Sequence, residues 1–527
     1  MTRCYLNIAI ISFALLLRIL VGIHPHSGQD DYQGPNNTPA NSNIKYGGDY
    51  EAQRHWMEIT YHLPINEWYY HDLEYWGLDY PPLTAYVSWM FGFVAHHVGS
   101  FHDNKFIIEE ENDEVIIEDI CQLEDQTCIE DQESVNTKER RYSKGLVVLK
   151  DLVALHTSRW GFEDSRGKLY MRFTVLISDL LVYISAVWVI VERLTKQKEY
   201  ASDINRDDII PVYQRPRLWL LLSALSQPAI ILIDHGHFQY NTISLGLALW
   251  SFHFISSSTN EFGPIVGSIL FSLALNFKQM ELYHALAVFA YLLGRCFRHA
   301  NRYTHIIANF IALGVTVILT FAMLWLPFVM SPPSDATSNL DGVLQIIKRV
   351  FPFQRGLFEG KVANIWCALS IKPFSIRSRI PENLLPLAAL ALTLVLILPP
   401  CWMLFKVGRG DNKQPNDGSD IRLLLWGTAS TSLAFFLASF QVHEKGILIP
   451  LASVSLLMLE APDFVYFFSI VATWSLWSLL VIDRLTDAYI CCLGIFVCIN
   501  SMVNVPEPQL NFYNDKLDIF SKRYFTR

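Results

Sequence analysis

Long apolar runs separated by polar segments make up most of the chain. Runs of about 18–25 residues recur along it, and each is long enough to cross about 30 Å of hydrocarbon as a helix. Because backbone groups inside lipid must hydrogen-bond to one another, these runs are predicted to be helices. The pattern predicts an all-α, polytopic membrane protein with about 11–14 transmembrane helices. The approximate limits of twelve candidate spans are 5–23, 171–192, 217–233, 241–256, 263–277, 283–297, 306–329, 383–405, 421–440, 446–460, 463–482 and 486–503.

Two apolar segments allow a second interpretation. The first run, from Leu6 to Val21, has the length of a signal peptide's apolar part. No clear small-residue cleavage site follows it, so a retained anchor is predicted. Residues 82–98 fit either a further span or an amphipathic helix that lies in the membrane interface.

Composition supports the membrane class. Of the 527 residues, 51% are hydrophobic and only 17% are charged, which is less charge than a soluble protein of this size carries. The net charge of -9 comes largely from residues 103–144, which we interpret as a solvated acidic insertion without a part in catalysis. The nine cysteines show no metal-ligand spacing. Cys121 and Cys128 lie in the acidic segment and could pair in an oxidising compartment or remain free thiols.

The distribution of Lys and Arg predicts which side of the membrane each loop reaches. Three short connections are basic, as is typical of cytoplasmic loops, and each follows an even-numbered span when 82–98 is not counted. The whole chain, 1–527, is predicted to form a single membrane domain. Its N-terminus is predicted to be cytoplasmic. The Asn36-Asn37-Thr38 glycosylation sequon agrees with a luminal first loop. The predicted luminal loops and turns are 24–170, 234–241, 276–282, 330–382 and 441–446. The basic residues of the three cytoplasmic connections are Arg193, Lys196, Lys198, Arg215, Arg217, Arg295, Arg298, Arg302, Lys406, Arg409, Lys413 and Arg422.

The first luminal loop contains a dense group of acidic, basic and aromatic residues around Asp49. Gly48 permits a turn, and Asp49 could cap the helix that follows. Arg54 lies three residues after Glu51 and four before Glu58, so ion pairs along one helix face are predicted. Alternatively, Asp49 could act as a general base, or the carboxylates could hold a divalent cation.

A second luminal segment, residues 74–86, combines aromatic rings with a carboxylate. Pro81 and Pro82 are well placed to open a helix. Asp79 could cap that helix, and the neighbouring aromatic rings could form an interfacial belt. The alternative is a sugar-binding site at Asp79 and Tyr80, since aromatic faces and carboxylates are what a hexose ring needs.

A third polar group, Asp234, His235, His237 and Gln239, ends a predicted span. Ionisable groups at this depth are costly unless they pair or line a cavity. A zinc site would need a fourth ligand that the pattern does not offer. Hydrogen bonds to a substrate or to neighbouring loops are therefore favoured.

In the predicted topology, five of the basic side chains from later segments fall on the same face as Asp49. A single lysine there could simply extend to the membrane surface. Five of them favour a phosphate site, because arginine binds phosphate through paired hydrogen bonds and lysine through its compact charge. They are Lys278, Arg355, Lys361, His443 and Lys445.

Seven ordered segments carry a family resemblance: GDYEAQRHWMEIT from Gly48, WGLDYPPLTAY from Trp76, LHTSRWGFE from Leu155, DHGHFQYN from Asp234, NFKQM from Asn276, RVFPFQRGLFEGKVANIWC from Arg349 and QVHEKGILIPL from Gln441. Together they resemble the dolichyl-phosphate-glucose-dependent glucosyltransferases of the endoplasmic reticulum, which are multispanning GT-C-type enzymes. They cover most of the chain apart from the acidic segment and the last stretch.

The resemblance implies that Asp49 is the catalytic base of an inverting transfer to the 3-hydroxyl of a terminal mannose, giving an α-1,3 linkage. It implies dolichyl phosphate glucose as donor, a dolichyl-pyrophosphate-linked oligosaccharide as acceptor, and a luminal site in the endoplasmic reticulum membrane. Lys361, Arg355 and Lys445 would stabilise the leaving phosphate, with His443 hydrogen-bonding. No cofactor, metal or nucleic-acid partner is expected. The predicted substrate-binding residues are Glu51, Arg54, Asp79, Tyr80, Asp234, His235, His237, Gln239, Lys278, Arg355, Glu359, Lys361, His443, Glu444 and Lys445.

Two alternatives to this function stay open. Within the family, the first segment looks like the member that adds the first glucose to the nine-mannose glycan, and the member that adds the second glucose is a close sibling. A lipid-glycan transporter would use substrate sites between inverted repeats. The chain shows no internal repeat, so transfer is favoured over transport.

Overall fold

The computed structural model describes residues 2–29, 48–71, 73, 75–98, 148–155, 164–199, 216–257, 261–298, 302–331, 339–351, 362–381, 383–410, 417–440 and 442–501. All regular structure in these ranges is helical, with no β-strand. The helices form two compact units, which are described separately. Unit 1 contains Met1–Pro25, Ser178–Ala322 and Phe353–Arg527, and unit 2 contains His26–Ile177 and Met323–Pro352.

Every predicted span coincides with helical structure, so the predicted all-α class is confirmed. The corresponding elements are α1 (Thr2–Ile23); α6 (Ser165–Ser178), η1 (Asp179–Ile184) and α7 (Ser185–Glu199); α8 (Pro216–Leu225), α9 (Pro228–Ile231) and η4 (Leu232–Phe238); α10 (Asn241–Ile255); α11 (Gly263–Phe277); α12 (Leu282–Phe297), after η5 (Gln279–Glu281); α13 (Tyr303–Met330); α17 (Leu385–Arg409); α18 (Asp417–Ala438); α19 (Leu448–Ser455), after η6 (Glu444–Ile447); α20 (Pro462–Ser475) and α21 (Trp477–Ile482); and α22 (Thr486–Ser501).

The length and apolar composition of several helices indicate a membrane protein. The most apolar stretch of α13 is almost entirely unburied, and its Ile318 and Met323 are exposed. Such a helix surface suits contact with lipid, and the chain is a multi-pass membrane protein. Of the described helices, six are long and apolar enough to cross a membrane: Tyr5–Ile23, Ser165–Thr195, Pro216–Phe238, Tyr303–Met330, Leu385–Arg409 and Asp420–Ala438. Gly263–Phe277 and Thr486–Ser501 are shorter apolar helices.

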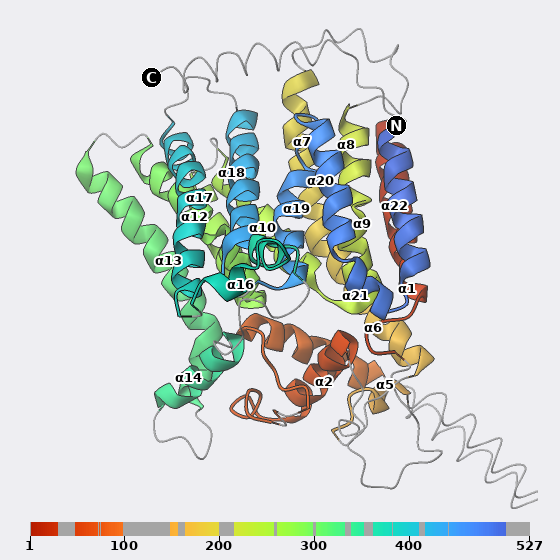
Figure 1. Ribbon diagram of the computed structural model, residues 1–527. Coiled ribbons are helices and arrows are strands. Elements are labelled where there is room, and N and C mark those ends of the chain that lie inside the picture. The colour runs from red at the N-terminus through yellow and green to blue at the C-terminus, as the bar shows by residue number, and fades with distance from the viewer. Residues whose placement is uncertain are drawn as a thin grey trace, which may run out of the picture. The chain divides into compact units, whose positions relative to one another are not determined.

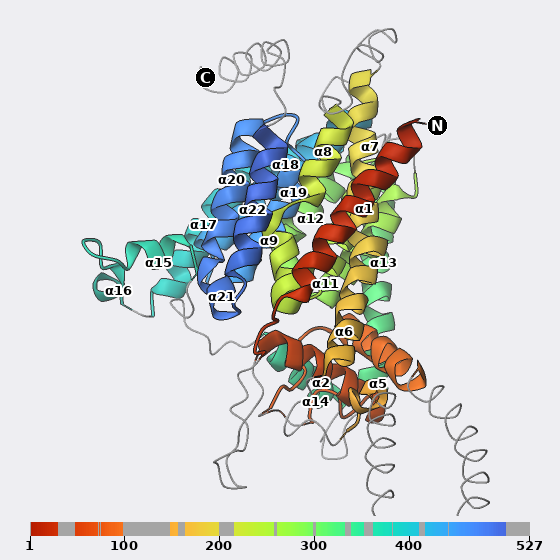
Figure 2. The ribbon, with the colours of Figure 1, turned by 90° about the vertical axis from the view of Figure 1, so that its right-hand side faces the viewer.

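Unit 1 is a bundle of these helices (Figure 1, Figure 2). α10 packs against α11, α12 packs against α17, and α18 contacts both α17 and α19. α1 and α22 both pack against α8. Where α12 meets α17, a Cβ atom on Gly294 would lie 2.2 Å from the Phe405 carbonyl oxygen, and one on Gly408 would lie 2.2 Å from that of Tyr291. Glycine at both positions lets the two helices approach closely.

Unit 1 also buries charged side chains in contact with one another. The Arg18 guanidinium of α1 binds Asp179 of η1, and Asp179 Oδ2 also lies 2.9 Å from His235 Nε2 of η4. His237 Nδ1 lies 2.5 Å from Asp483 Oδ2. An isolated charge in an apolar bundle would be costly, so these contacts fix the relative positions of the helices that carry them.

Unit 2 is built on α2 (Gly48–His62), with α5 (Val148–Asp151), α6, α14 (Asn339–Val350) and a helix over 82–98. The last of these begins at Pro82, as predicted. Its Trp89 and Phe93 are exposed, so both interpretations of this segment remain open. The apolar core of unit 2 contains Ala52, Trp56, Ile59, Trp68, Tyr69, Leu78, Ala85, Phe328, Ile346 and Val350. The short helices α15 (Ile365–Leu369) and α16 (Ile376–Arg379) belong to unit 1.

Candidate functional site

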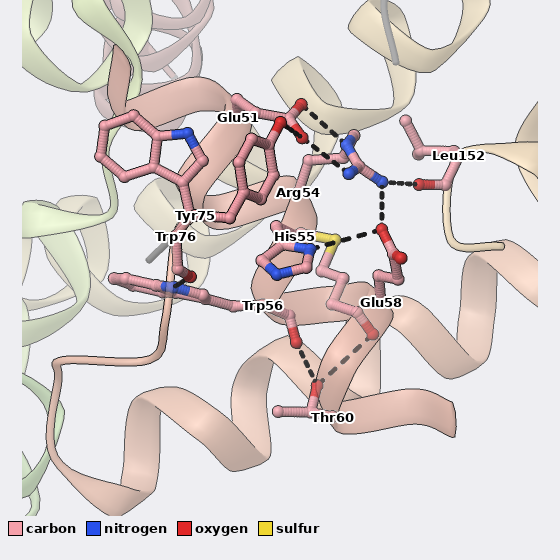
Figure 3. A network of polar contacts seen from close by, with 10 residues as sticks. Glu51, Arg54, His55, Trp56, Glu58, Thr60, Tyr75, Trp76 and Leu152 are labelled. Atoms are coloured by element: carbon pink, nitrogen blue, oxygen red, sulfur yellow. Dashed lines mark hydrogen bonds and ion pairs between the residues drawn. The ribbon is translucent and has the colours of Figure 1, made fainter. Parts of the chain in front are cut away.

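α2 carries a buried ionic network (Figure 3). Arg54, which is 0% exposed, donates to both carboxylate oxygens of Glu51, with Nε–Oε2 at 2.8 Å and Nη2–Oε1 at 2.7 Å. Its Nη1 donates to Glu58 Oε2 at 2.9 Å and to the Leu152 carbonyl oxygen at 2.7 Å. The Tyr75 hydroxyl donates to Glu51 Oε1 at 2.8 Å. The ion pairs predicted from the spacing are confirmed. The hydrogen bonds with Leu152 and Tyr75 connect α2 to two other segments of unit 2.

Burial and charge act in opposite directions on this network. Burial alone would raise the pKa of Glu58, but its hydrogen bond with His55 and the charge of Arg54 hold that pKa below the ordinary glutamate value. Burial raises the pKa of Tyr75, and the Glu51 carboxylate raises it further, so the phenol stays protonated and donates. Glu51 and Arg54 were predicted to contact substrate. Because their polar atoms bind one another here, a part in positioning α2 is favoured.

Asp49 lies half-buried in the first turn of α2. Its backbone N–H donates to Ser27 Oγ at 3.1 Å, although the sequence suggested that Asp49 itself caps the helix. The ring of Tyr50 stacks on His26, with 3.7 Å between centroids. Gly48 has a φ of 87°, in the left-handed region that favours glycine. Residues before the helix therefore fix its start, and with it the Asp49 backbone.

Replacing Gly48 by alanine is expected to disturb this start. The new Cβ would lie 2.4 Å from three atoms of Ser27, and the left-handed backbone by itself costs about 1–2 kcal/mol for a non-glycine residue. A clear fall in the thermal unfolding midpoint of the purified protein is expected. Gly314→Ala is the control, because nothing lies within 4 Å of its Cβ position. Equal midpoints for the two variants would contradict this account.

The segment that contains Asp79 and Tyr80 is held from two sides. Trp56 of α2 donates to one of its carbonyl oxygens at 2.9 Å, and Arg349 of α14 donates to another at 2.9 Å. Asp79 and Tyr80 are both half-buried. Sugar binding by these two side chains stays a prediction, now on a segment whose backbone is fixed by hydrogen bonds.

In unit 1, the end of η4 and the start of α10 form a polar cluster. Asn241 Nδ2 donates to Asp234 Oδ1 at 2.6 Å and to Gln239 Oε1 at 2.9 Å. The Thr242 N–H donates to Asp234 Oδ2 at 2.6 Å. Lys278 Nζ, just after α11, donates to Gln239 Oε1 at 3.0 Å and to Asn241 Oδ1. Three predicted residues, Asp234, Gln239 and Lys278, therefore belong to one hydrogen-bonded group.

The two histidines of the same segment have other neighbours. His235 binds Asp179, and His237 binds Asp483. Their rings therefore join helices of the bundle. Among the residues that the structure describes, no three His, Cys, Asp or Glu side chains gather in a way that could hold a metal ion.

Two lysines from distant turns line one small recess in unit 1. Lys278 follows α11, Lys445 lies in η6, and their exposed fractions are 4% and 5%. The described parts of the turns 234–241, 276–282 and 441–446 thus meet in space. The other lining residues are Asn241, Ser244, Leu245, Met280, Glu281, Leu448 and Ile449.

The helices around this recess favour an anion. Asn241 begins α10, η5 leads into α12, and η6 leads into α19, so three helix N-termini adjoin the recess. Each carries a partial positive charge that adds to the charge of the lysines. The exposed His443 caps η6, because its Nδ1 accepts the Lys445 N–H at 3.3 Å, and Glu444 beside it is half-buried.

Some site residues differ from the predicted set. Arg355, Glu359 and Lys361 lie outside the described residues. Asn241 and Glu281 were not predicted as site residues, although Asn241 ends one predicted polar segment and Glu281 directly follows another. Ser27 was also missed, because its contact with Asp49 joins residues 22 positions apart and leaves no local pattern. The residues that contribute to the site but were not predicted from the sequence are Ser27, Asn241 and Glu281.

Comparison with known proteins identifies the family. The ALG6, ALG8 glycosyltransferase family matches residues 14–115 and 142–524. The chain belongs to this family. It is therefore a multi-pass membrane glycosyltransferase, and the resemblance found in the sequence is confirmed. The interval between the matched ranges falls inside the acidic segment 103–144, which was interpreted as an insertion.

Relatives with the same kind of name align over most of the chain. It is 35% identical over 505 residues to the probable dolichyl pyrophosphate Man9GlcNAc2 alpha-1,3-glucosyltransferase of Dictyostelium discoideum, covering 94% of this chain and 78% of that protein. It is 38% identical over 451 residues to the Gallus gallus enzyme of that name, covering 84% and 70%. For the probable Schizosaccharomyces pombe enzyme, the identity is 36% over 509 residues, covering 95% and 81%.

Proposed function

We propose that this chain transfers glucose from dolichyl phosphate glucose to a dolichyl-pyrophosphate-linked oligosaccharide that carries nine mannoses, forming an α-1,3 linkage with inversion. The names of the three relatives describe this acceptor and linkage for those proteins. The observation that carries the proposal here is the recess with Lys278 and Lys445 beside three helix N-termini. Such a site suits the phosphate of a lipid-linked sugar.

The proposed location is the endoplasmic reticulum membrane, with the reaction on its luminal side. Two features support this side. The basic connections of the chain favour a cytoplasmic N-terminus, and three of the turns expected on the opposite face meet at the recess. The donor lipid enters the bilayer while its sugar must meet a polar acceptor, so a site at the ends of membrane helices suits both substrates.

In the proposed reaction, the 3-hydroxyl oxygen of the terminal mannose attacks the anomeric carbon of the glucosyl group. Asp49 accepts the hydroxyl proton. The bond from the anomeric carbon to the phosphate oxygen breaks, and its electron pair leaves with dolichyl phosphate. Lys278 and Lys445 stabilise the negative charge that grows on this leaving group. Attack on the face opposite the phosphate converts a β-linked donor into an α-linked product.

The other predicted contacts complete the proposal. Arg355 and Lys361 would add positive charge near the phosphate. Asp79 and Tyr80 would bind a sugar ring through a carboxylate and an aromatic face. Residues whose polar groups bind other parts of the protein would position these contacts. The proposed positioning residues are Glu51, Arg54, Asp234, His235, His237, Gln239 and His443, with Glu359 and Glu444 as further polar contacts.

The direct test supplies the purified chain with dolichyl phosphate glucose and one defined lipid-linked acceptor at a time. Incorporation of one glucose into the nine-mannose acceptor is expected. Incorporation only into the acceptor that already carries one glucose would assign the chain to the sibling reaction. No incorporation into either acceptor, with transbilayer movement of the glycan, would favour a transporter.

Neutralising either recess lysine is expected to weaken donor use. Lys278→Gln and Lys445→Gln should each lower kcat/KM for the donor by about 10²-fold, because one cation at a developing negative charge contributes about 2.7 kcal/mol or more. Initial rates over a range of donor concentrations measure the change. Lys406→Gln is the matched control, since this lysine lies over Trp402 near the end of α17. A control that loses as much activity as the recess variants would contradict the assignment.

A further inference from the structure

Glu281 is a buried carboxylate in the same recess whose full hydrogen-bonding capacity is not used. It is the last residue of η5, is 0% exposed and lines the recess with both lysines. Its Oε2 lies 2.9 Å from His284 Nδ1, one turn along the chain. Its Oε1 is buried and has no hydrogen-bond partner among the described residues. A buried carboxylate oxygen in this state costs free energy that a bound donor group would recover.

The partner of Oε1 must be a hydrogen-bond donor, whereas the lysines and helix N-termini favour an anion. One nitrogen of the polar cluster, Lys278 Nζ, already donates to Gln239 and Asn241. A ligand that supplies both kinds of group carries a phosphate and a hydroxyl close together. A glycosyl phosphate has this chemistry, because the phosphate adjoins a ring that bears several hydroxyl groups.

We infer that Glu281 Oε1 accepts a hydrogen bond from a hydroxyl of the donor's glucosyl ring and so selects the sugar that is transferred. The inference rests on the proposed function and adds a specificity-determining residue to it. His284 is a positioning residue, because its contact with Oε2 leaves Oε1 for the ligand. Phe252 packs edge-on against the His284 ring at 5.2 Å between centroids and limits its movement.

The rival explanation is that Glu281 only balances the charge of the two lysines. The two explanations differ in what they predict for altered sugars. A charge-balancing residue affects every donor equally, since all donors carry the same phosphate. A hydroxyl acceptor affects only those donors that possess the hydroxyl it binds.

The test compares dolichyl phosphate glucose with its monodeoxy analogues, each lacking one ring hydroxyl, as donors for the wild-type protein, Glu281→Ala and Glu281→Gln. For the wild type, one analogue should have a kcat/KM lower by roughly 10- to 100-fold, as expected for loss of a hydrogen bond to a charged group. For Glu281→Ala, the kcat/KM for dolichyl phosphate glucose should fall to that of this analogue, so that the two donors are used equally well. Glu281→Gln keeps the side-chain volume and one acceptor oxygen, so it should retain part of the discrimination.

Thermal unfolding of each variant separates selectivity from folding. Asp420→Asn is the matched control: it weakens a carboxylate contact with Arg298 of 2.7 Å elsewhere in unit 1. It should lower the midpoint while leaving the ratio between donors unchanged. If Glu281→Ala does not fold, the ratio of kcat/KM between glucose and the deoxy analogue in Glu281→Gln tests the inference. Equal loss for all donors in the Glu281 variants would overturn the inference but leave the function standing, whereas a wild-type protein that transfers no glucose would overturn both.

Discussion

Replacing Asp49 by asparagine is expected to lower the rate of glucose transfer by about 10²- to 10⁴-fold, the usual contribution of a general base. Asparagine has nearly the same shape but cannot accept the proton of the attacking hydroxyl at neutral pH. The backbone contact that fixes this position, from the Asp49 N–H to Ser27 Oγ, does not depend on the side chain. The loss should therefore appear in kcat, with little change in the thermal unfolding midpoint.

A second aspartate at a helix start provides the control for this experiment. Asp164 is half-buried in unit 2, and its Oδ2 accepts the Arg166 N–H at 2.7 Å at the beginning of α6. Asparagine serves nearly as well in such a position, so Asp164→Asn should retain most of the activity. Near-normal transfer by purified Asp49→Asn protein would refute the assignment of Asp49 as the base.

Replacing Arg54 by leucine is expected to destabilise unit 2 by about 3–5 kcal/mol, because removing one partner of a buried ion pair leaves its partners uncompensated. Glu51 and Glu58, which are 2% and 0% exposed, would both lose their guanidinium contacts. Thermal unfolding of the purified protein at neutral pH measures the effect. Arg166→Leu on the exposed face of α6 is the control, and it should change the midpoint little.

The pH dependence of stability gives this prediction a second readout. In the wild type, Glu58 has a lowered pKa, so its contribution is present above the unfolded-state value of about 4.3 and is lost as pH falls through the folded-state pKa. Without Arg54, burial would raise the pKa of Glu58 instead. Arg54→Leu should therefore gain stability as the pH falls towards about 5, where the wild type gains none. If the stability of Arg54→Leu decreased with falling pH in the same way as that of the wild type, the role given to Arg54 would be contradicted.

The helices and the class of the protein follow from the sequence. Lipid leaves the backbone only its own polar groups to bond with, so an apolar run such as residues 306–329 forms a helix wherever it lies in the fold; α13 covers that run. The pairs between Arg54 and its two glutamates are equally local, because residues three and four apart share a helix face. The family also followed from ordered motifs that span most of the chain.

Contacts between distant segments required the tertiary structure. Lys278 and Lys445 are separated by more than a hundred residues, and only helix packing brings both to one recess. The same packing leaves Glu281 Oε1 without a partner among the described residues, a property of neighbouring atoms that no spacing encodes. Ser27 likewise meets the start of α2, although it lies 22 positions before Asp49 in the sequence. The sequence determined the helices because their hydrogen bonds are local, whereas the recess depends on where side chains from separate helices come to lie.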